Sequence, residues 1–585
     1  MWGVSLSCIR AWGGMLLLAV AMMLGARRDA RADSCAVITK DHTSSAAEQA
    51  FLAADYEKAA TLYRTELGSH ANDPELTEGL VRVLLRAQKV QEASDTVTAA
   101  LTANPGSAVL LTAKGEVELR QGVPWDAAKT AAAAFKSDPC QPRVHLLISH
   151  LSRLSSMYAN AQAEILLAHR LDPNDPDIRG AWIGTLPLRE RAAELERYLA
   201  TPTGDDAEER HREQLGLEHL KKRLNESHKA CRLTSTTAST EIPFIELLYD
   251  ATHIRAFGLQ VKMNQHASRL EIDTGAGGLV VSRSVAQHAG LQPFSETEIG
   301  GVGSKADSTG YTAYADSIQI GNLEFRDCMV EVVDNKRMLD IEGLIGMDVF
   351  SKFLVTLNYP GRKLKLDPLP PRPGDIVTTP SLDTSASEDE EDAEKVGGAA
   401  AGSTASKTGE ANLDGTSLEA SAVKTAQVVS KPIRNKGPFN RYIAPEMKDY
   451  TQVFRVGHGL MMPVFLNQSK LKLFILDTGA WATSISPTAA REVTKVHSDD
   501  SLHVRGLNGE VAKAYSADEV KFSFAKITQT IRQVPSFDTA KLSKDFGLEI
   551  SGFLGARTLE LTTIHIDYRD GLVKFDYDPK AVHPY

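Results

Sequence analysis

The sequence predicts a multidomain protein in which an all-α helical-repeat solenoid is followed by two all-β lobes. Three observations support this fold class. Helix-forming residues fill the chain up to about residue 230. Short alternating apolar runs with Gly and Asn punctuation follow, which is typical of β structure. This β pattern then occurs a second time, after a stretch that lacks aromatic residues. A chain of 585 residues is long enough for roughly three or four domains.

Residues 43–230 are rich in Ala, Leu, Glu and Arg, which are good helix formers. Asn104-Pro105, Asp138-Pro139 and Asp172-Pro173 lie 34 residues apart, and Asp73-Pro74 lies 31 residues before the first of them. A proline after a polar residue ends one helix and starts the next. The period resembles that of tetratricopeptide repeats, although their Trp-x-x-Leu-Gly signature is absent. That resemblance implies a solenoid that recruits a peptide or protein partner. A spacer that binds nothing specific is the alternative.

Residues 1–32 have the pattern of a secretory signal peptide. Arg10 precedes an apolar run over residues 11–25, and Ala30-Arg31-Ala32 offers a small-x-small cleavage site. We therefore expect an exported protein, periplasmic or secreted. The apolar run is shorter than the roughly 20 residues that span a bilayer. Arg27-Arg28 after the run is unusual for a signal, so an uncleaved N-terminal anchor is the alternative.

The cysteines and the net charge bear on three properties: disulfide bonds, metal binding and nucleic-acid binding. Besides Cys8, four cysteines remain, and in an exported chain they could form two disulfides with three connectivities. These are Cys35, Cys140, Cys231 and Cys328. Their spacings match no zinc pattern, and buried thiols are the alternative. The net charge of −10 argues against a nucleic-acid partner. We expect no metal and no cofactor.

Residues 371–437 are predicted to be a disordered linker between lobes at 240–370 and 438–585. The segment opens with Pro371-Arg372-Pro373, is rich in Ser, Ala, Thr and Gly, and carries the acidic run 388–392. Without aromatic residues it cannot bury enough apolar surface to fold. Its composition suits a flexible tether.

The two β units contain the same succession of motifs. In each, an apolar strand leads into Asp-Thr-Gly-Ala, at residues 273–276 and 477–480. A Ser-containing strand and a short helix follow in both. Later, Leu344-Ile345-Gly346 and Phe553-Leu554-Gly555 supply two apolar residues and a glycine, before a short helix and a strand that ends in Asn-Tyr or Asp-Tyr.

These motifs resemble the retropepsin-like branch of the aspartic peptidases, over about residues 240–367 and 440–585. The resemblance implies that Asp273 and Asp477 are the catalytic carboxylates, because two close carboxylates share a proton and can activate a water. It also implies that Thr274 and Thr478 cross-bond the two turns. Glycine lets the turns approach without a Cβ, which explains Gly275 and Gly479.

Each lobe of that family also carries a flap hairpin between the two motifs. The candidate flap residues are Gly301, Val302, Gly303, Gly506, Leu507 and Asn508. Glycine there permits a tight hairpin tip, although neither tip offers an obvious flap tyrosine. His288, His458 and His565 are isolated in the sequence and are predicted to be solvated or core residues.

The sequence therefore predicts an aspartic endopeptidase that acts on a peptide or protein substrate. Since one lobe supplies one Asp, two lobes must pair, and we favour pairing within one chain, with a homodimer as the alternative. A non-catalytic peptide-binding protein is a second hypothesis, although retention of both Asp residues argues against it. A scaffold whose lobes only dimerise the chain is the third.

Overall fold

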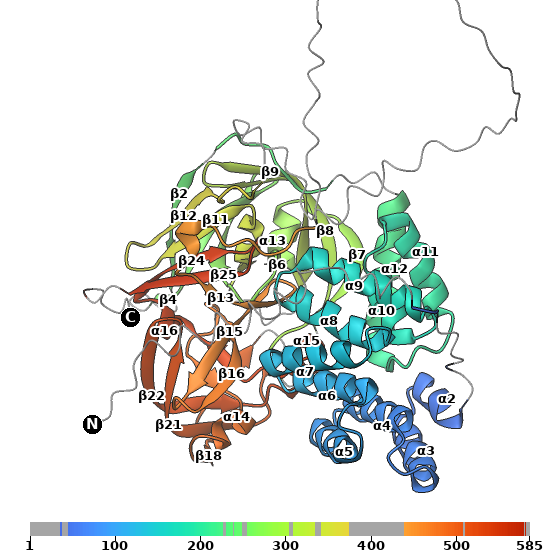
Figure 1. Ribbon diagram of the computed structural model, residues 1–585. Helices are drawn as coiled ribbons and strands as arrows, with labels where there is room; N and C mark the ends of the chain where they lie inside the picture. The colour runs from blue at the N-terminus through green and yellow to red at the C-terminus, as the bar shows by residue number, and fades with distance from the viewer. Residues whose placement is uncertain are drawn as a thin grey trace, which may run out of the picture.

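The computed structural model describes residues 35–37, 42, 45–225, 230–237, 239–248, 254–303, 308–333, 341–373, 438–506, 509–577 and 580. Helices occupy residues 46–225, and β-rich regions follow (Figure 1). The predicted fold class is confirmed. The predicted signal peptide and nearly all of the predicted linker lie outside the described residues. No helix among those residues is both long and apolar enough to cross a membrane.

The helical region is built from antiparallel pairs that stack along the chain (Figure 1). Its helices are α2 (Ala46–Leu52), α3 (Tyr56–Ser69), α4 (Pro74–Arg86), α5 (Val90–Ala103), α6 (Ala108–Arg120), α7 (Pro124–Ser137), α8 (Pro142–Leu154), α9 (Tyr158–Leu171), α10 (Pro176–Ile183), α11 (Leu188–Leu199) and α12 (Ala207–Asn225).

The predicted helix breakers act in two different ways. Asp73 caps α4 by accepting hydrogen bonds from backbone N–H groups, and Pro74 is the first residue of that helix. The pairs at 104–105, 138–139 and 172–173 instead lie between helices. The next helix begins three residues after each of these prolines, so those pairs end a helix without starting the following one.

A buried network of ion pairs connects α4, α8, α10 and the start of α12. Arg143 binds Glu78 at 3.0 Å and Asp175 at 2.8 Å, and Arg82 binds Asp177 at 3.2 Å. Arg82 and Arg143 are both buried. Buried charges require such partners, because an unpaired charge there would be very costly. The polar side chains on this face of the repeats are thus engaged within the chain.

The first lobe is a nine-stranded sheet accompanied by short helices. Its elements are β1 (Arg232–Leu233), β3 (Ile245–Leu248), β4 (Ile254–Met263), β5 (His266–Ile272), β6 (Leu279–Ser282), α13 (Arg283–His288), β7 (Pro293–Ile299), β8 (Ser308–Ile320), β9 (Leu323–Val333), β10 (Gly343–Ile345) and η3 (Met347–Phe350).

The second lobe repeats this plan with an eight-stranded sheet and a two-stranded hairpin. Its elements are η4 (Pro445–Met447), β14 (Phe454–Val456), β15 (Gly459–Leu466), β16 (Lys470–Leu476), β17 (Ser484–Ile485), α14 (Pro487–Arg491), β18 (Val496–Ser498), β19 (Arg505–Gly506), β20 (Gly509–Glu510), β21 (Ala514–Phe524), β22 (Ile527–Phe537), α15 (Ala540–Phe546), β23 (Gly552–Leu554) and α16 (Ala556–Leu559).

A six-stranded sheet joins the two lobes within the chain. Its order is β13 (Thr451–Gln452), β25 (Leu572–Tyr577), β24 (Thr562–Asp567), β11 (Phe353–Asn358), β12 (Lys363–Pro368) and β2 (Thr240–Pro243). At its centre β11 of lobe 1 pairs antiparallel with β24 of lobe 2, with Val355 opposite Ile566. Both of these side chains are fully buried, so the joint is part of the hydrophobic core.

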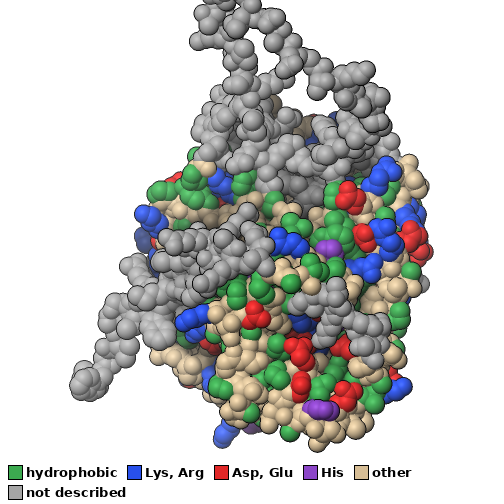
Figure 2. All heavy atoms as spheres, turned by 45° about the vertical axis from the view of Figure 1, so that its right-hand side comes forward, with side chains coloured by type: hydrophobic (Ala, Val, Ile, Leu, Met, Phe, Trp, Pro, Cys, Tyr) green, Lys and Arg blue, Asp and Glu red, His purple; other side chains and the backbone are tan. Residues whose placement is uncertain are grey.

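The helical region contacts both lobes. Arg120 on α6 donates to the Ser543 carbonyl on α15, and Lys544 on α15 pairs with Asp206 at 2.7 Å. On the other side, α12 packs against β7 of lobe 1. Two disulfides, Cys35–Cys140 and Cys231–Cys328, select one of the three connectivities left open by the sequence. The face shown in Figure 2 carries both acidic and basic side chains, and neither sign covers it.

Candidate active site

The two Asp-Thr-Gly turns are built in the same way. β5 and β16 end immediately before Asp273 and Asp477. β10 pairs in parallel with β5, and β23 pairs in parallel with β16, which places each apolar-apolar-Gly element beside its turn. The backbone N–H groups of Asp273 and Asp477 donate to the carbonyls of Ile345 and Leu554, both at 3.1 Å. These contacts fix each aspartate backbone in a rigid sheet.

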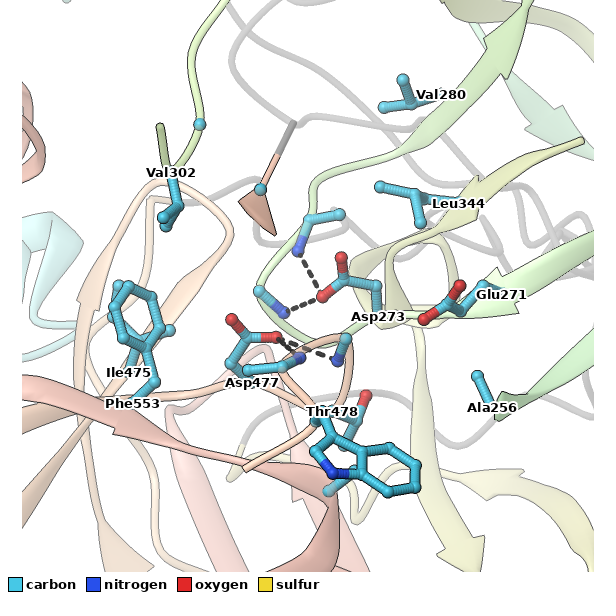
Figure 3. Close-up of a pocket in the computed structure, with 18 of the residues that line it drawn as sticks. Ala256, Glu271, Asp273, Val280, Val302, Leu344, Ile475, Asp477, Thr478 and Phe553 are labelled. Carbon is cyan, nitrogen blue, oxygen red and sulfur yellow. Dashed lines mark hydrogen bonds between the residues drawn. The ribbon is translucent and has the colours of Figure 1, made fainter. Parts of the chain in front are cut away.

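Each aspartate side chain is also held by its own turn. Oδ1 of Asp273 accepts from the N–H groups of Gly275 at 2.8 Å and Ala276 at 3.1 Å. Oδ1 of Asp477 accepts from Gly479 and Ala480, both at 2.9 Å (Figure 3). Oδ1 of each carboxylate is therefore fixed by its own turn.

Two buried threonines connect the turns. The Thr274 hydroxyl accepts from the Thr478 N–H at 3.0 Å and donates to the Leu476 carbonyl at 2.8 Å. The Thr478 hydroxyl accepts from the Thr274 N–H and donates to the Ile272 carbonyl, both at 3.1 Å. This reciprocal arrangement is the cross-bonding that the family resemblance implied.

The turns approach closely enough for the two carboxyl groups to interact. A Cβ on Gly275 would lie 2.8 Å from Cγ of Asp477, and one on Gly479 would lie 2.5 Å from Cγ of Asp273. Only glycine fits at such a distance. Figure 3 shows the two carboxylates side by side at the floor of a cavity.

The electrostatic environment of the two carboxyls differs. Burial raises the pKa of both Asp273 and Asp477. The neighbouring charge of Asp273 raises the pKa of Asp477 further, well above its usual range. Hydrogen bonds from the Gly275 N–H and from Asp477 oppose the rise at Asp273. Two close carboxyls cannot both ionise cheaply, so one proton stays on the pair.

The carboxylates open into a cavity of about 1610 Å³ between the lobes. Its two sides are lined by apolar residues from different lobes. Val280 and Leu344 come from lobe 1, whereas Ile475 and Phe553 come from lobe 2 (Figure 3). Apolar side chains of both lobes therefore border the space into which the two carboxyls open.

Both flap candidates border this cavity, and they meet each other. Gly301, Val302 and Gly303 follow β7, and the first two of them line the cavity. Gly506 ends β19 and also lines it, and a Cβ on Gly506 would lie 2.3 Å from the Val302 carbonyl. Leu507 and Asn508 lie outside the described residues. The described flap residues of the two lobes thus contact each other at the border of the cavity.

Two further polar residues lie next to the Asp273 turn, and neither was predicted from the sequence. Asp348, on η3, accepts from the Gly278 N–H at 2.9 Å. His458, in the hairpin between β14 and β15, lies 3.1 Å from the Gly275 carbonyl through Nε2. His458 is partly buried and lines the cavity, and its contact joins positions 183 residues apart in sequence, which local patterns could not reveal.

The other two histidines lie elsewhere. The His288 ring stacks on His266 in lobe 1. His565 contacts Thr356 at 3.0 Å across the sheet that joins the lobes. Neither of them lines the cavity. Their contacts are structural.

A buried carboxyl stands behind the Asp273 turn. Glu271 is 6% exposed and accepts from Arg255 at 2.8 Å. Burial raises the pKa of Glu271 to about 7, and the Arg255 charge opposes this rise. Glu271 lines the cavity beside the apolar residues of lobe 1 (Figure 3).

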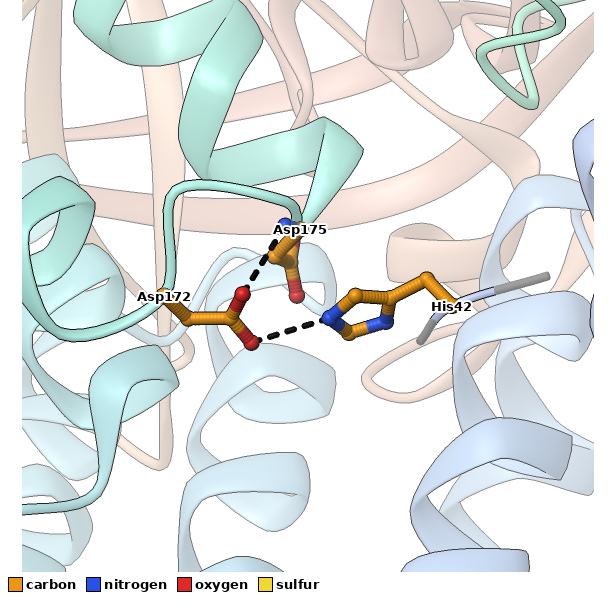
Figure 4. Close-up of side chains that lie close together, drawn as sticks. All are labelled: His42, Asp172 and Asp175. Atoms are coloured by element: carbon orange, nitrogen blue, oxygen red, sulfur yellow. Dashed lines mark hydrogen bonds and ion pairs between the residues drawn. The ribbon is translucent and has the colours of Figure 1, made fainter. Parts of the chain in front are cut away.

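One cluster in the helical region has a spacing that could suit a metal ion. His42, Asp172 and Asp175 place their ligand atoms within 4.8 Å of one another (Figure 4). Asp172 accepts from His42 at 2.9 Å and from backbone N–H groups at 3.2 Å. Asp175 caps α10 with one oxygen and binds Arg143 at 2.8 Å with the other. Every carboxylate oxygen already accepts a hydrogen bond, so the contacts suffice to explain the cluster.

Residues 259–349 match the family model of aspartyl proteases. The matched segment runs from β4 to η3 and contains Asp273. Together with the observed fold, the match confirms the predicted resemblance.

Two solved structures illustrate what the chain is similar to. A thermophilic TPR protein from Thermus thermophilus is 22% identical, with 29% of this chain and 95% of that protein covered and a TM-score of 0.24. A retropepsin-like aspartic protease from Rickettsia conorii is 22% identical, with 22% of this chain and 90% of that protein covered and a TM-score of 0.17. A search of curated proteins finds no match.

Proposed function

We propose that this protein is an aspartic endopeptidase whose active site is formed by Asp273 and Asp477 of one chain. The observation that carries the proposal is the pair of turns: each aspartate is fixed by its own turn, and the two turns are cross-bonded by Thr274 and Thr478. A protein that only binds peptides has no need for two buried carboxyls held against each other, because their mutual repulsion destabilises the fold.

In the proposed reaction, a water molecule lies between the two carboxyls and the substrate carbonyl. The ionised aspartate removes a proton from the water, whose oxygen attacks the carbonyl carbon. The protonated aspartate gives its proton to the carbonyl oxygen, which produces a tetrahedral gem-diol. The aspartate that received the proton from water then gives it to the peptide nitrogen, and the other aspartate takes a proton from one gem-diol hydroxyl. The C–N bond breaks to leave a carboxylic acid and an amine, and one proton is again shared by the pair. No covalent bond to the enzyme forms.

Substrate recruitment by the repeats remains part of the hypothesis. The contacts of the repeats also favour a second, structural role, in which the repeats hold the second lobe in place. The ion-pair network commits one polar face of α4 and α8 to partners within the chain. Arg120 and Lys544 tie the repeats to α15, whose residues Leu542 and Phe546 line the cavity. Recruitment would therefore use another surface of the repeats.

The proposal is tested with a peptide library across acidic to neutral pH. We expect wild type to cleave, and Asp273→Asn or Asp477→Asn to lose roughly 10²- to 10⁴-fold in kcat/KM, since each removes an acid–base group. Asp518→Asn, an exposed substitution in lobe 2, is the matched control and should keep full activity. If wild type cleaves nothing at any pH, or if one variant stays fully active, the proposed dyad is wrong.

A further inference from the structure

His458 belongs to lobe 2 but lies on the active-site turn of lobe 1. It sits in the hairpin between β14 and β15, and its Nε2 is 3.1 Å from the Gly275 carbonyl oxygen. A carbonyl oxygen only accepts hydrogen bonds, so Nε2 carries the hydrogen. In the neutral ring Nδ1 therefore carries no hydrogen.

The turn of lobe 1 is shaped to receive this ring. A Cβ on Gly277 would lie 2.5 Å from Nδ1 of His458, which no side chain could tolerate without displacing the ring. Lobe 2 has Trp481 at the matching position of its own turn, and that residue lines the cavity. The two Asp-Thr-Gly turns are thus equivalent in backbone and different in their neighbours. The close approach depends on glycine at position 277.

The charged groups around the ring come from several elements. Asp273 lies in the turn after β5, and Asp348 lies on η3. Burial raises the pKa of both carboxyls, hydrogen bonds from backbone N–H groups oppose this rise, and a positive charge on His458 opposes it by a smaller amount. Asp477 faces Asp273 from the turn after β16. Arg455, on β14, also lowers the pKa of Asp348 and donates to the carbonyls of Tyr568 and Gly457. The Tyr568 ring lies beneath the Arg455 guanidinium.

We propose that His458 is a positioning residue that breaks the symmetry of the two carboxyls. It holds the Asp273 turn through the Gly275 carbonyl, and in its protonated form it stabilises the ionised carboxylate of Asp273. Asp273 then removes the proton from water, while Asp477 holds the shared proton and donates it to the substrate carbonyl. The assignment of these two roles rests on the proposed peptidase function. The coupling of His458 to the carboxyls does not depend on that function.

The coupling is tested without catalysis, by NMR titration of the full-length protein with labelled histidine, in which His458→Gln identifies the resonance. Coupling between two titrating groups is reciprocal. Removing the negative charge in Asp273→Asn or in Asp348→Asn should therefore lower the pH at which the His458 resonance titrates. Asp518→Asn, whose carboxylate pairs with the distant His497, is the control and should leave it unchanged. An unchanged midpoint in both active-site variants overturns the proposal.

The kinetic test separates the charge of His458 from its hydrogen bond. His458→Gln retains an N–H donor for the Gly275 carbonyl but cannot be protonated, whereas His458→Leu loses both properties. Without the positive charge, Asp273 ionises at higher pH. The acid limb of the kcat/KM profile should therefore move upward by about 0.5 to 1 pH unit in the Gln variant, with its plateau within a few-fold of wild type.

The Leu variant should show the same displacement and also a lower plateau, while His497→Gln, an exposed histidine of lobe 2, should leave the profile unchanged. An acid limb of His458→Gln that coincides with that of wild type contradicts the proposed role. A wild-type protein that cleaves no peptide contradicts the proposed function instead, and the NMR titration still decides whether His458 is coupled to Asp273 and Asp348.

Discussion

At the scale of single residues, two buried hydroxyls hold the dyad together. Thr274→Val would keep the shape of the side chain but leave the Leu476 carbonyl and the Thr478 N–H without their partner. Each buried group left unpaired costs about 1–3 kcal/mol. We expect the free energy of unfolding to fall by roughly 2–6 kcal/mol, measured by urea denaturation. Thr274→Ser retains the hydroxyl and should lose less than about 1.5 kcal/mol. Equal stability of the two variants would show that the cross-bonds contribute little.

The sequence could predict the residues of the two turns because the motif is local. Asp273 and Asp477 each stand at the end of an apolar strand, and the matching apolar-apolar-Gly elements support both positions. His458 could not be found in this way, since its partner Gly275 lies on the other lobe. The sequence did show one difference between the turns: Gly277 in the first turn corresponds to Trp481 in the second. That difference shows that the turns have unlike neighbours, but not which neighbour.

At the scale of elements, α12 supports the strand that leads into the lobe 1 flap. Lys222 donates to the Phe294 carbonyl and His219 contacts the Ser295 hydroxyl, both at 2.7 Å. β7 then runs directly into Gly300–Gly303 above the cavity. The helix and the strand were both expected in their regions, but the contact between them has no local pattern in the sequence.

The joint change His219→Ala with Lys222→Ala is therefore expected to act on substrate binding rather than on chemistry. Two lost hydrogen bonds, each contributing about 0.5–1.5 kcal/mol, should raise KM by roughly 5- to 150-fold, with kcat less affected. Steady-state kinetics on one peptide measures both constants. Lys221→Ala removes the neighbouring lysine, which pairs with Glu196 on α11, and should leave KM unchanged. If the double variant has the same KM as wild type, α12 does not influence substrate binding through the flap.

At the scale of the whole molecule, the central pairing of β11 with β24 joins the two lobes of one chain. The sequence left homodimer pairing open, because the segment between the lobes is long enough to permit either arrangement. Strand pairing across the lobes depends on contacts between residues far apart in sequence, which periodicity alone cannot reveal. Val355, Leu357, Ile564 and Ile566 are all fully buried at this joint. Separating the lobes would expose them, at about 1.5–3 kcal/mol for each large apolar side chain.

We therefore expect an active monomer and no complementation between inactive chains. Asp273→Asn and Asp477→Asn proteins are each purified, mixed in equal amounts and assayed on a peptide that wild type cleaves. If each site forms within one chain, every site in the mixture lacks one carboxylate and the mixture stays inactive. Lobes exchanged between chains would combine the intact Asp273 of one variant with the intact Asp477 of the other, so restored cleavage would contradict intrachain pairing.

Pairing of like lobes would instead leave Asp273→Asn active alone, through two copies of Asp477. A mixture of wild type with Asp273→Asn controls for inhibition and should show the activity of its wild-type fraction.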